Sequence, residues 1–194
     1  MNVSEKYMGL VLAGGQSTRM GRDKSLLNYH GQPQRDYVRH LLLPYCDDVF
    51  IAVKNKSSED PAWFMADDPS LGDIGPMAGL LTAFHRYPQH AWIVAGSDYP
   101  LIHPRTFSTL INAVTSASQA VAFTNPETHR AEPLLTVYLP SVLPVLEARY
   151  ANGRFSLQEL LGEVAVVNLE AEDNRWLQSI DTPEQAEKLI KSLS

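Results

Sequence analysis

Thirteen residues near the N-terminus combine the groups that bind phosphate. Residues 12–24 (LAGGQSTRMGRDK) contain three glycines, two hydroxyl side chains, two arginines and a lysine, and they directly follow an apolar run. Glycines let neighbouring backbone N–H groups converge on phosphate oxygens, while Arg19 and Lys24 supply full positive charges. The segment therefore predicts a loop that binds a triphosphate. A glycine-rich turn that carries surface charges is the structural alternative.

The common phosphate-binding patterns do not describe this loop. A P-loop requires a lysine directly after its last glycine, whereas two residues separate Gly21 from Lys24. Gly14 and Gly15 are adjacent, so they do not begin a G-x-G-x-x-G fingerprint. The sequence therefore disfavours both a kinase-like protein and a dinucleotide-binding Rossmann protein.

Aspartates that follow apolar runs are the candidate metal ligands. Asp98 comes after the run 91–96 (AWIVAG), so we expect its carboxylate at the end of a strand, facing the same crevice as the glycine-rich loop. Mg²⁺ is usually held by one or two carboxylates together with substrate phosphates. Asp98 is therefore the predicted Mg²⁺ ligand, with a turn or helix cap as the alternative role. Asp181, which precedes Thr182 and Pro183, is a candidate second ligand or a cap of the last helix.

Other reactive residue types form no recognised site. Asp67, Asp68 and Asp73 lie in a segment rich in turn formers and are interpreted first as turn residues. Cys46 is the only cysteine, which excludes an internal disulfide and a cysteine-based zinc site, and we expect it to be packed. Ser17 lacks the G-x-S-x-G context of a nucleophile and is expected to hydrogen-bond phosphate. The histidines show no zinc-ligand spacing: His30, His40, His85, His90, His103 and His129.

Strand and helix patterns alternate along the chain. Strands are predicted at 7–12, 48–54, 91–96, 119–124, 133–138 and 164–169. Helices are predicted at 33–45, 75–87, 104–114, 141–150, 156–161 and from Pro183 onward, where Thr182 and Gln185 fit a capping box. This alternation predicts an α/β fold with a mostly parallel central sheet, helices on both faces and a ligand crevice at the carboxyl ends of the strands.

Composition limits the organisation and the partners of the chain. With 194 residues, 44% of them hydrophobic, we expect a single domain that covers residues 1–194. The formal charge is −6 and the basic residues are scattered, which argues against nucleic acid as a partner. No apolar stretch approaches the length of about 20 residues that a membrane-spanning helix needs, and no signal peptide is recognised. We therefore expect a cytoplasmic protein with no membrane partner.

Four motifs resemble those of the molybdenum cofactor guanylyltransferases, the MobA-type family of nucleotidyltransferases. Residues 12–24 resemble the family loop L-A-G-G-x-S-x-R-M-G-x-D-K, and residues 75–79 (GPMAG) resemble its GPLAG segment. Residues 97–101 (SDYPL) are similar to C-D-x-P-L, and residues 180–184 (IDTPE) are similar to N-x-N/D-T-P-E. The motifs occur in the family order and span most of the chain. The resemblance therefore implies a Rossmann-like nucleotidyltransferase fold and nucleotide transfer.

The resemblance also implies roles for individual residues. Arg19, Lys24 and Asp98 are the implied catalytic residues, and Asp98 is the implied Mg²⁺ ligand with Asp181 as a candidate second ligand. By its position before GPMAG, Asp68 matches a family aspartate that contacts the nucleotide. The implied nucleotide-binding set is Leu12, Ala13, Gly14, Gly15, Arg19, Lys24, Asp68 and Asp98.

Two positions depart from the family pattern, and two arginines lie in the half that binds the acceptor. Ser97 stands where the family often has cysteine, and Asp181 stands where guanylyltransferases often have asparagine. Arg130 and Arg154 lie in the second half of the chain, where the family binds its acceptor. Both are candidate acceptor-binding residues, with an ordinary surface arginine as the alternative.

The resemblance also implies the substrates. The second glycine of LAGG is typical of the guanylyltransferases, which implies GTP rather than CTP. The implied acceptor is molybdenum-loaded molybdopterin, the product is a guanine dinucleotide form of the cofactor, and molybdoenzyme assembly proteins are candidate partners. Two alternatives stay open: an enzyme that uses a sugar phosphate or another phosphorylated metabolite as acceptor, and a catalytically silent GTP-binding module.

Overall fold

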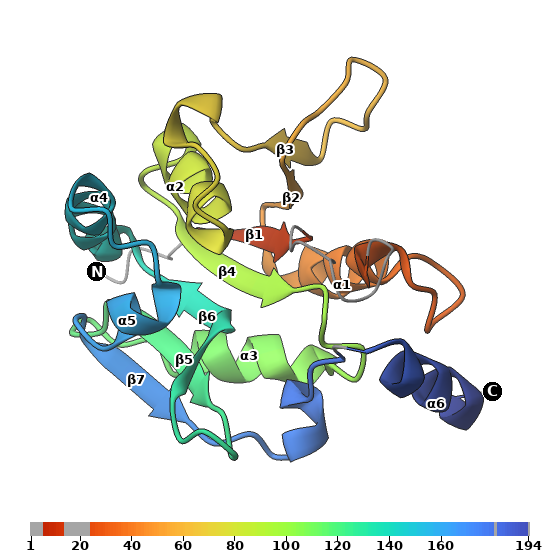
Figure 1. Cartoon of the computed structure of the whole chain (residues 1–194). Coiled ribbons are helices and arrows are strands. Elements are labelled where there is room, and N and C mark those ends of the chain that lie inside the picture. Colours follow the sequence, from red (N-terminus) through yellow and green to blue (C-terminus); the bar gives the residue numbers. More distant parts are fainter. Residues whose placement is uncertain (1–5, 14–23, 181, 194) are drawn as a thin grey trace.

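A seven-stranded sheet forms the centre of the protein (Figure 1). The computed structural model describes residues 6–13, 24–180 and 182–193. The strands lie in the order β3-β2-β1-β4-β6-β5-β7. Their bounds are β1 (Tyr7–Leu12), β2 (Asp48–Val53), β3 (Phe64–Ala66), β4 (Ala91–Gly96), β5 (Ala120–Thr124), β6 (Ala131–Tyr138) and β7 (Val166–Leu169).

Most neighbouring strands are parallel. β1 pairs in parallel with β2 and β4, β2 with β3, and β5 with β7, whereas β6 is antiparallel to both β4 and β5. A short turn at residues 125–130 joins β5 to β6, and antiparallel pairing needs no longer connection. The predicted α/β fold with a mostly parallel sheet is therefore confirmed.

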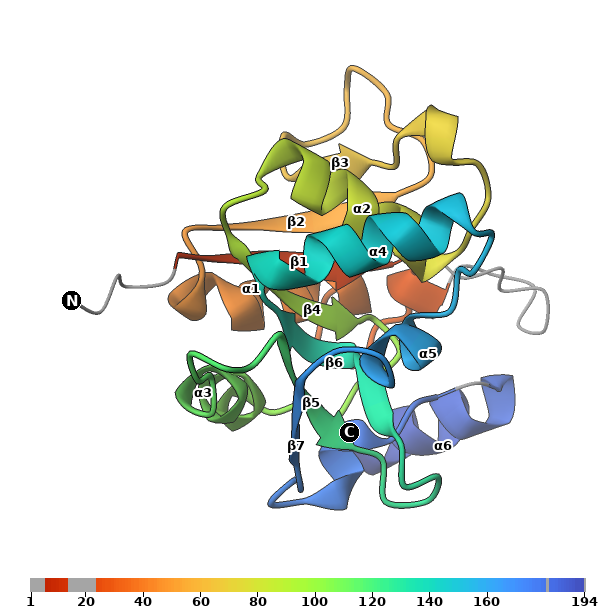
Figure 2. The same ribbon diagram turned by 90° about the vertical axis from the view of Figure 1, so that its left-hand side faces the viewer.

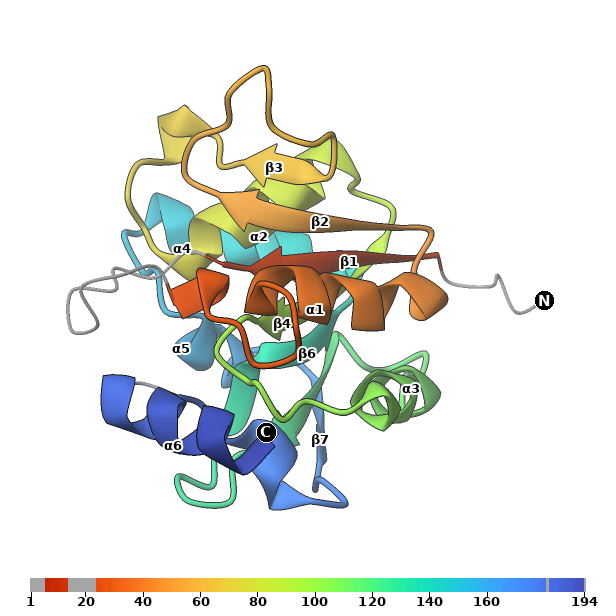
Figure 3. The same ribbon diagram turned by 90° about the vertical axis from the view of Figure 1, so that its right-hand side faces the viewer.

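Helices cover both faces of the sheet. Helices α1 and α3 lie on the face turned to the viewer in Figure 3, and α2, α4 and α5 lie on the opposite face, seen in Figure 2. Two separate groups of buried side chains fill the space between the sheet and these helices. The helix bounds are α1 (Gln34–Leu42), α2 (Pro76–Arg86), α3 (Pro104–Asn112), α4 (Leu143–Ala151), α5 (Leu157–Leu161) and α6 (Pro183–Leu193).

The central strands are buried on both faces, which explains their unbroken apolar sequences. Leu10 and Val11 of β1 and Ile93, Val94 and Ala95 of β4 have no exposed surface. A strand that is covered by helices on both sides has no solvent-facing positions, so polar and apolar residues need not alternate.

Beyond shifts of one or two residues at element ends, three differences from the predicted elements have a clear local cause. β3 was not predicted, because three residues are too few to show a periodic pattern. The predicted helix 33–45 ends as an α-helix at Leu42 and continues as the 3-10 turn Leu43–Tyr45, since Pro44 cannot donate a helical hydrogen bond. A 3-10 turn, Pro140–Val142, likewise precedes α4, whose own Pro144 lies in the first turn. None of the helices in the described part of the chain is long and apolar enough to cross a membrane.

The last helix begins with the predicted capping box. The backbone N–H of Thr182 donates to Oε1 of Gln185 at 3.1 Å, and the N–H of Gln185 donates to Oγ1 of Thr182 at 3.2 Å. Ala186 of this helix packs with Leu27 and Ile180 in a third, smaller group of buried side chains. The C-terminal helix is thus attached next to the segment that follows the glycine-rich loop.

One edge of the sheet collects the ends of all strands except β6, and we call it the carboxyl edge. At this edge the chain leaves β1 toward α1 on one face, and it leaves β3 toward α2 on the other face. β1 lies between β2 and β4, so the direction in which strands are added reverses at the β1/β4 pair. In open α/β sheets, ligands bind outside the carboxyl ends of the strands at such a reversal.

Candidate active site

The first two residues of the predicted site lie where the fold requires them. Leu12 ends β1 beside Gly96, the last residue of β4, and Ala13 follows at the carboxyl edge. Gly14, Gly15, Arg19 and Asp181 lie outside the residues that the structure describes. The glycine-rich loop therefore begins at the β1/β4 reversal, and its roles stay predictions.

The carboxylate of Asp98 folds back over the end of β4. A Cβ atom added to Gly96 would collide with Oδ1 of Asp98 and would lie 3.0 Å from Cε2 of Tyr99. Glycine at position 96 leaves the space that this carboxylate occupies. The predicted metal ligand therefore lies at the carboxyl edge, close to the end of β1, where the glycine-rich loop begins.

The backbone of one residue, Ile180, connects Lys24 to the segment of Asp98. The backbone N–H of Ile180 donates to the carbonyl oxygen of Asp98 at 3.0 Å, and Nζ of Lys24 donates to the carbonyl oxygen of Ile180 at 3.4 Å. Three motifs that are far apart in the sequence therefore meet: the end of the glycine-rich loop, the loop after β4 and the segment before α6. Their convergence brings the ammonium group of Lys24 and the backbone of Asp98 to the same part of the carboxyl edge.

The GPMAG segment forms the beginning of α2 and lets this helix approach the sheet closely. Gly75 has a positive φ of 65° and precedes Pro76, the first residue of the helix. A Cβ on Gly79 would lie 2.8 Å from Cδ2 of Leu12 and 3.2 Å from Cβ of Ala52. Glycine at position 79 is therefore required by packing against the ends of β1 and β2.

Asp68 has its carboxylate engaged within its own loop. Oδ1 of Asp68 accepts hydrogen bonds from the backbone N–H and the hydroxyl of Ser70, at 2.9 and 2.7 Å. These bonds cap the 3-10 turn Pro69–Leu71 and hold the pKa of Asp68 below its usual range. Its backbone N–H is bound by Oγ1 of Thr82. Asp68 is thus a turn residue in this structure, and its predicted contact with the nucleotide is untested.

Its neighbour Asp67, interpreted from the sequence as a solvated turn residue, points inward. Among the described residues, Oδ1 of Asp67 is buried without a hydrogen-bond partner, and it lies 3.5 Å from the position of a Cβ on Gly79. Burial raises the pKa of Asp67 to about 6, although Lys54 lowers it. A half-buried carboxylate with an inward oxygen that lacks a partner is costly, and such groups are frequent at ligand-binding sites.

A cavity of about 450 Å³ opens beside Asp67. Its lining combines apolar surface with the basic side chains of Lys54, Lys56 and Arg86, which suits an anionic or heterocyclic ligand. The lining residues are Lys54, Asn55, Lys56, Ala66, Asp67, Asp68, Pro69, Thr82, His85 and Arg86. Asp73, the third aspartate of the loop, forms an exposed ion pair with Lys54 at 2.8 Å.

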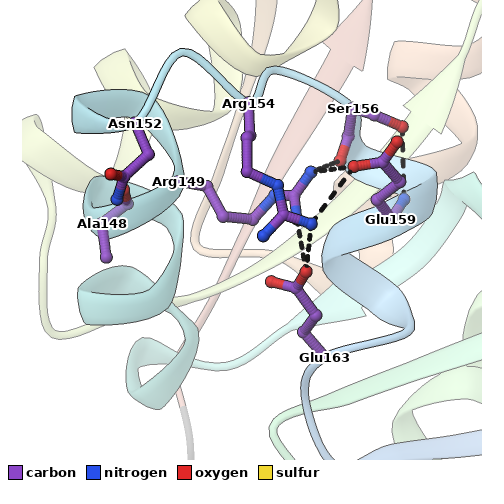
Figure 4. A network of polar contacts seen from close by, with 7 residues as sticks. All are labelled: Ala148, Arg149, Asn152, Arg154, Ser156, Glu159 and Glu163. Atoms are coloured by element: carbon purple, nitrogen blue, oxygen red, sulfur yellow. Dashed lines mark hydrogen bonds and ion pairs between the residues drawn. The ribbon is translucent and has the colours of Figure 1, made fainter.

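Arg154 belongs to a network of charges between α4 and α5 (Figure 4). Its guanidinium, half exposed, binds the carboxylates of Glu159 and Glu163. The same carboxylates bind Arg149 at 2.7 and 2.8 Å, and the Arg149 side chain is only 2% exposed. Arg149 was not singled out from the sequence, because a buried arginine has no local sequence signal.

Arg130 lies at the carboxyl edge. It belongs to the turn between β5 and β6, where its carbonyl oxygen accepts a hydrogen bond from the N–H of Asn125 at 2.8 Å. The residue is exposed, and β5 ends at the same edge as β4. Arg130 is therefore on the side of the sheet where the site opens.

The oxygen ligands at this edge fit a magnesium ion that is shared with a nucleotide. In the part of the chain that the structure describes, no group of three or more histidine, cysteine, aspartate or glutamate side chains could hold a metal by itself. Mg²⁺ needs no such group when phosphates supply the remaining ligands. The carboxylate of Asp98, placed over Gly96, is an oxygen donor of the kind that such an ion takes from a protein.

These features define a class of protein: an open α/β sheet that binds a nucleotide at its strand reversal. Comparison with known families specifies the class further. The MobA-like NTP transferase domain matches residues 9–168, which is most of the chain. The chain belongs to this family of nucleotidyltransferases.

Individual relatives agree with this assignment. The chain is 35% identical over 182 residues to a molybdenum cofactor guanylyltransferase of Pseudomonas entomophila, covering 90% of this chain and 93% of that one. It is 32% identical over 181 residues to a molybdenum cofactor biosynthesis bifunctional protein of Synechocystis; the match covers 91% of this chain and about half, 51%, of that longer protein. Among solved structures, the molybdopterin-guanine dinucleotide biosynthesis protein A of Archaeoglobus fulgidus superposes with a TM-score of 0.78 at 21% identity, covering 95% and 97% of the two chains.

Proposed function

We propose that this protein is a Mg²⁺-dependent molybdenum cofactor guanylyltransferase. It transfers GMP from GTP to the phosphate of molybdenum-loaded molybdopterin and releases pyrophosphate. The names of its relatives support the substrates. The observation that carries the proposal is the convergence of Lys24 and the Asp98 segment on the backbone of Ile180, at the strand reversal of a chain from this family.

The proposed reaction is an in-line displacement at phosphorus. A phosphate oxygen of the acceptor forms a bond to the α-phosphorus of GTP, and the bond between that phosphorus and the bridging oxygen of the β-phosphate breaks. The electron pair leaves with pyrophosphate. The protein contributes position and charge rather than covalent chemistry.

Each proposed catalytic residue has one task. Lys24 and Arg19 bind the β- and γ-phosphates together with backbone N–H groups of Gly14 and Gly15, and they neutralise the charge that develops on the leaving pyrophosphate. Asp98 holds Mg²⁺, with Asp181 as a candidate second ligand. The ion, when bound, neutralises charge on the α-phosphate and the attacking oxygen.

For the base, we propose a contact that the sequence did not indicate. Guanine presents two donors on one edge, the N1–H and the 2-amino group, and a carboxylate can accept both. Asp67 has an inward oxygen without a partner among the described residues, and it borders the cavity beside β3. We propose that Asp67 accepts from guanine and that Leu12, Ala13 and Asp68 are further contacts of the nucleotide.

The acceptor side of the proposal rests on fewer contacts. Arg130 at the carboxyl edge and Arg154 beside α5 are the proposed ligands of the acceptor phosphate. Arg154 would have to exchange part of its ion pairing with Glu159 and Glu163 for the acceptor. Assembly proteins as partners and a cytoplasmic location stay predictions of the sequence.

The test is pyrophosphate release from each of the four nucleoside triphosphates with Mg²⁺, with and without molybdenum-loaded molybdopterin. A parallel series replaces molybdopterin with sugar phosphates. We expect release only with GTP and the molybdopterin acceptor, and none when Mg²⁺ is chelated. Release with a sugar phosphate would overturn the acceptor, and GTP binding without release on any acceptor would indicate a silent binding module.

A further inference from the structure

Three consecutive carbonyl oxygens in the loop after β4 each accept a hydrogen bond from a different part of the chain. The carbonyl of Asp98 is bound by the N–H of Ile180 at 3.0 Å. The carbonyl of Tyr99 is bound by Nε2 of Gln34 at 3.2 Å, and the carbonyl of Pro100 is bound by Nε2 of His30 at 2.7 Å. The loop that carries Asp98 is therefore held on the side of α1 by two side chains.

Gln34 is an unusual residue for its position. It begins α1 and has no exposed surface. In the described part of the chain its Oε1 is buried without a hydrogen-bond partner, although Nε2 is bound to Tyr99. A buried amide with one unsatisfied end costs stability that leucine or methionine would not cost. Its single hydrogen bond to the loop of Asp98 is what distinguishes it from an apolar residue.

His30 is oriented by its surroundings. Its ring stacks on the ring of Tyr37 with centroids 3.8 Å apart. The turn that carries it contains Gly31, whose φ is 79°, and a bridge between Asn28 and Pro33 closes this turn. Because a carbonyl oxygen only accepts, Nε2 of His30 carries the proton in this contact. The stack and the turn direct this N–H at Pro100.

We propose that His30 and Gln34 are positioning residues that fix Asp98 for the metal and the α-phosphate. They act through the backbone: holding the carbonyls of Tyr99 and Pro100 fixes the peptide groups that follow Asp98. The bond from Ile180 fixes Asp98 itself. Together these contacts set the direction of the Asp98 side chain over Gly96. This inference rests on the proposed function, in which Asp98 holds the metal.

The test uses Gln34→Leu, which keeps the size of the side chain and removes the donor, with Gln119→Leu as a matched control. Gln119 also binds a backbone carbonyl, that of Ser141 at 3.0 Å, but it precedes β5 and lies at the opposite edge of the sheet. We expect Q34L to lower kcat about tenfold with little change in the KM for GTP. We also expect weaker binding of Mn²⁺ in the presence of GTP, measured by electron paramagnetic resonance. Q119L should retain wild-type kcat and Mn²⁺ binding.

A purely structural role for Gln34 gives a different result. In that case Q34L would lower the melting temperature but leave kcat per folded molecule and Mn²⁺ binding unchanged, and the proposal would be overturned. If Q34L does not fold, His30→Phe tests the same proposal, because phenylalanine keeps the stack on Tyr37 and removes the donor. His30→Gln, which restores a donor, should recover most of the activity that H30F loses.

A double-mutant cycle separates this inference from the proposed function. Combined with Asp98→Ala, Q34L should lower the residual rate by less than twofold, because its effect passes through Asp98. An undiminished tenfold loss in the D98A background overturns the positioning role while the guanylyltransferase assignment stands. Absence of Mn²⁺ binding in the wild-type protein with GTP overturns the metal assignment, and the positioning role falls with it.

Discussion

Lys24 is linked to the Asp98 segment through the backbone of Ile180. In the proposed site, Lys24 supplies positive charge for the phosphates and Asp98 supplies the carboxylate for the metal. Lys24→Ala and Asp98→Ala should each lower the rate of GMP transfer on the order of 10²–10³-fold, as loss of one preorganised electrostatic group commonly does. Pyrophosphate release at saturating GTP measures the effect. Lys188→Ala, on the exposed side of α6, is the control and should retain full activity. Unchanged turnover in both K24A and D98A would refute the site.

The ionised carboxylate of Asp67 should lower the free energy of unfolding, even though we propose that it binds guanine. Its folded pKa is about 6 against a usual 3.8, so the folded state holds the proton more tightly than the unfolded state. Ionising Asp67 therefore costs stability: the cost is absent below pH 3.8, grows as pH rises and is complete above about pH 6. Asp67→Asn should raise the free energy of unfolding at pH 7.5 by about 1 kcal/mol, a value reduced for solvent screening at this half-buried site.

Urea unfolding at pH 7.5 and at pH 3.5 tests this expectation, and the gain should disappear at the lower pH. Asp73→Asn, an exposed residue of the same loop, is the control and should change stability little. If Asp67 also accepts from guanine, D67N should reduce the preference for GTP over ATP. If Asp67 is kept for function at a cost in stability, we expect D67N to be more stable and less selective than the wild type.

At the scale of single residues, the sequence predicted the positions in the fold of residues that belong to motifs, while their roles stay predictions. Leu12, Lys24 and Asp98 lie at the carboxyl edge as expected, and Thr182 and Gln185 form the expected capping box. Asp67 was not predicted, because the direction of a side chain in an irregular loop is set by packing against Gly79. The contacts of His30 and Gln34 were not predicted for a similar reason. Their partners are backbone carbonyls, which every residue has, so no residue type in the sequence indicates them.

The junction between α4 and α5 depends on one buried arginine. Arg149 has its side chain 2% exposed and donates to Glu159, Glu163 and the carbonyl of Ser156. Arg149→Met should lower the free energy of unfolding by about 2–4 kcal/mol, because it leaves two carboxylates without their central cation and removes a buried network. Urea unfolding measures this loss. Arg105→Met, which breaks the exposed pair with Glu172, should cost less than about 1 kcal/mol.

The loss in R149M should depend on pH. Hydrogen bonds from Arg149 hold the pKa values of Glu159 and Glu163 below the usual 4.5. The stabilisation they provide is present above pH 4.5 and is lost as pH falls through their lowered pKa values. The difference between wild type and R149M should therefore shrink below pH 4.5. A difference that is constant with pH would show that packing, rather than charge, explains the effect.

Helices and strands were predicted correctly where a long apolar pattern or a capping motif defines them. Their ends were predicted less well where a single residue, such as a proline, interrupts the pattern. The strands at 7–12 and 91–96 and the helix from Pro183 were predicted at their observed positions, because apolar runs and capping residues define them. Pro44 ends α1 earlier than its apolar stripe suggests. The antiparallel direction of β6 follows from the short turn after β5. The periodicity of residues within a strand does not show the direction in which the strand runs.

The whole molecule should be most stable along its two central strands. β1 and β4 lie in the middle of the sheet with core residues that have no exposed surface, whereas β3 and β7 form its edges. Native-state hydrogen exchange should therefore be slowest at Leu10, Val11, Ile93 and Val94, and faster in β7 by at least tenfold. Equal protection of β7 and β4 would show that the edge opens only with global unfolding. GTP should leave the central strands unchanged and slow exchange around Asp98.

The hydrogen bond between Ile180 and Asp98 sets the time at which the site can form during synthesis. All seven strands precede residue 170, so they are synthesised before Ile180 and α6. Ile180 and α6 are synthesised after these strands, and Ile180 is the residue that joins Lys24 to Asp98. A nascent chain would thus possess the fold before it possesses the site. Activity would begin only after the segment around Ile180 has docked beside Asp98.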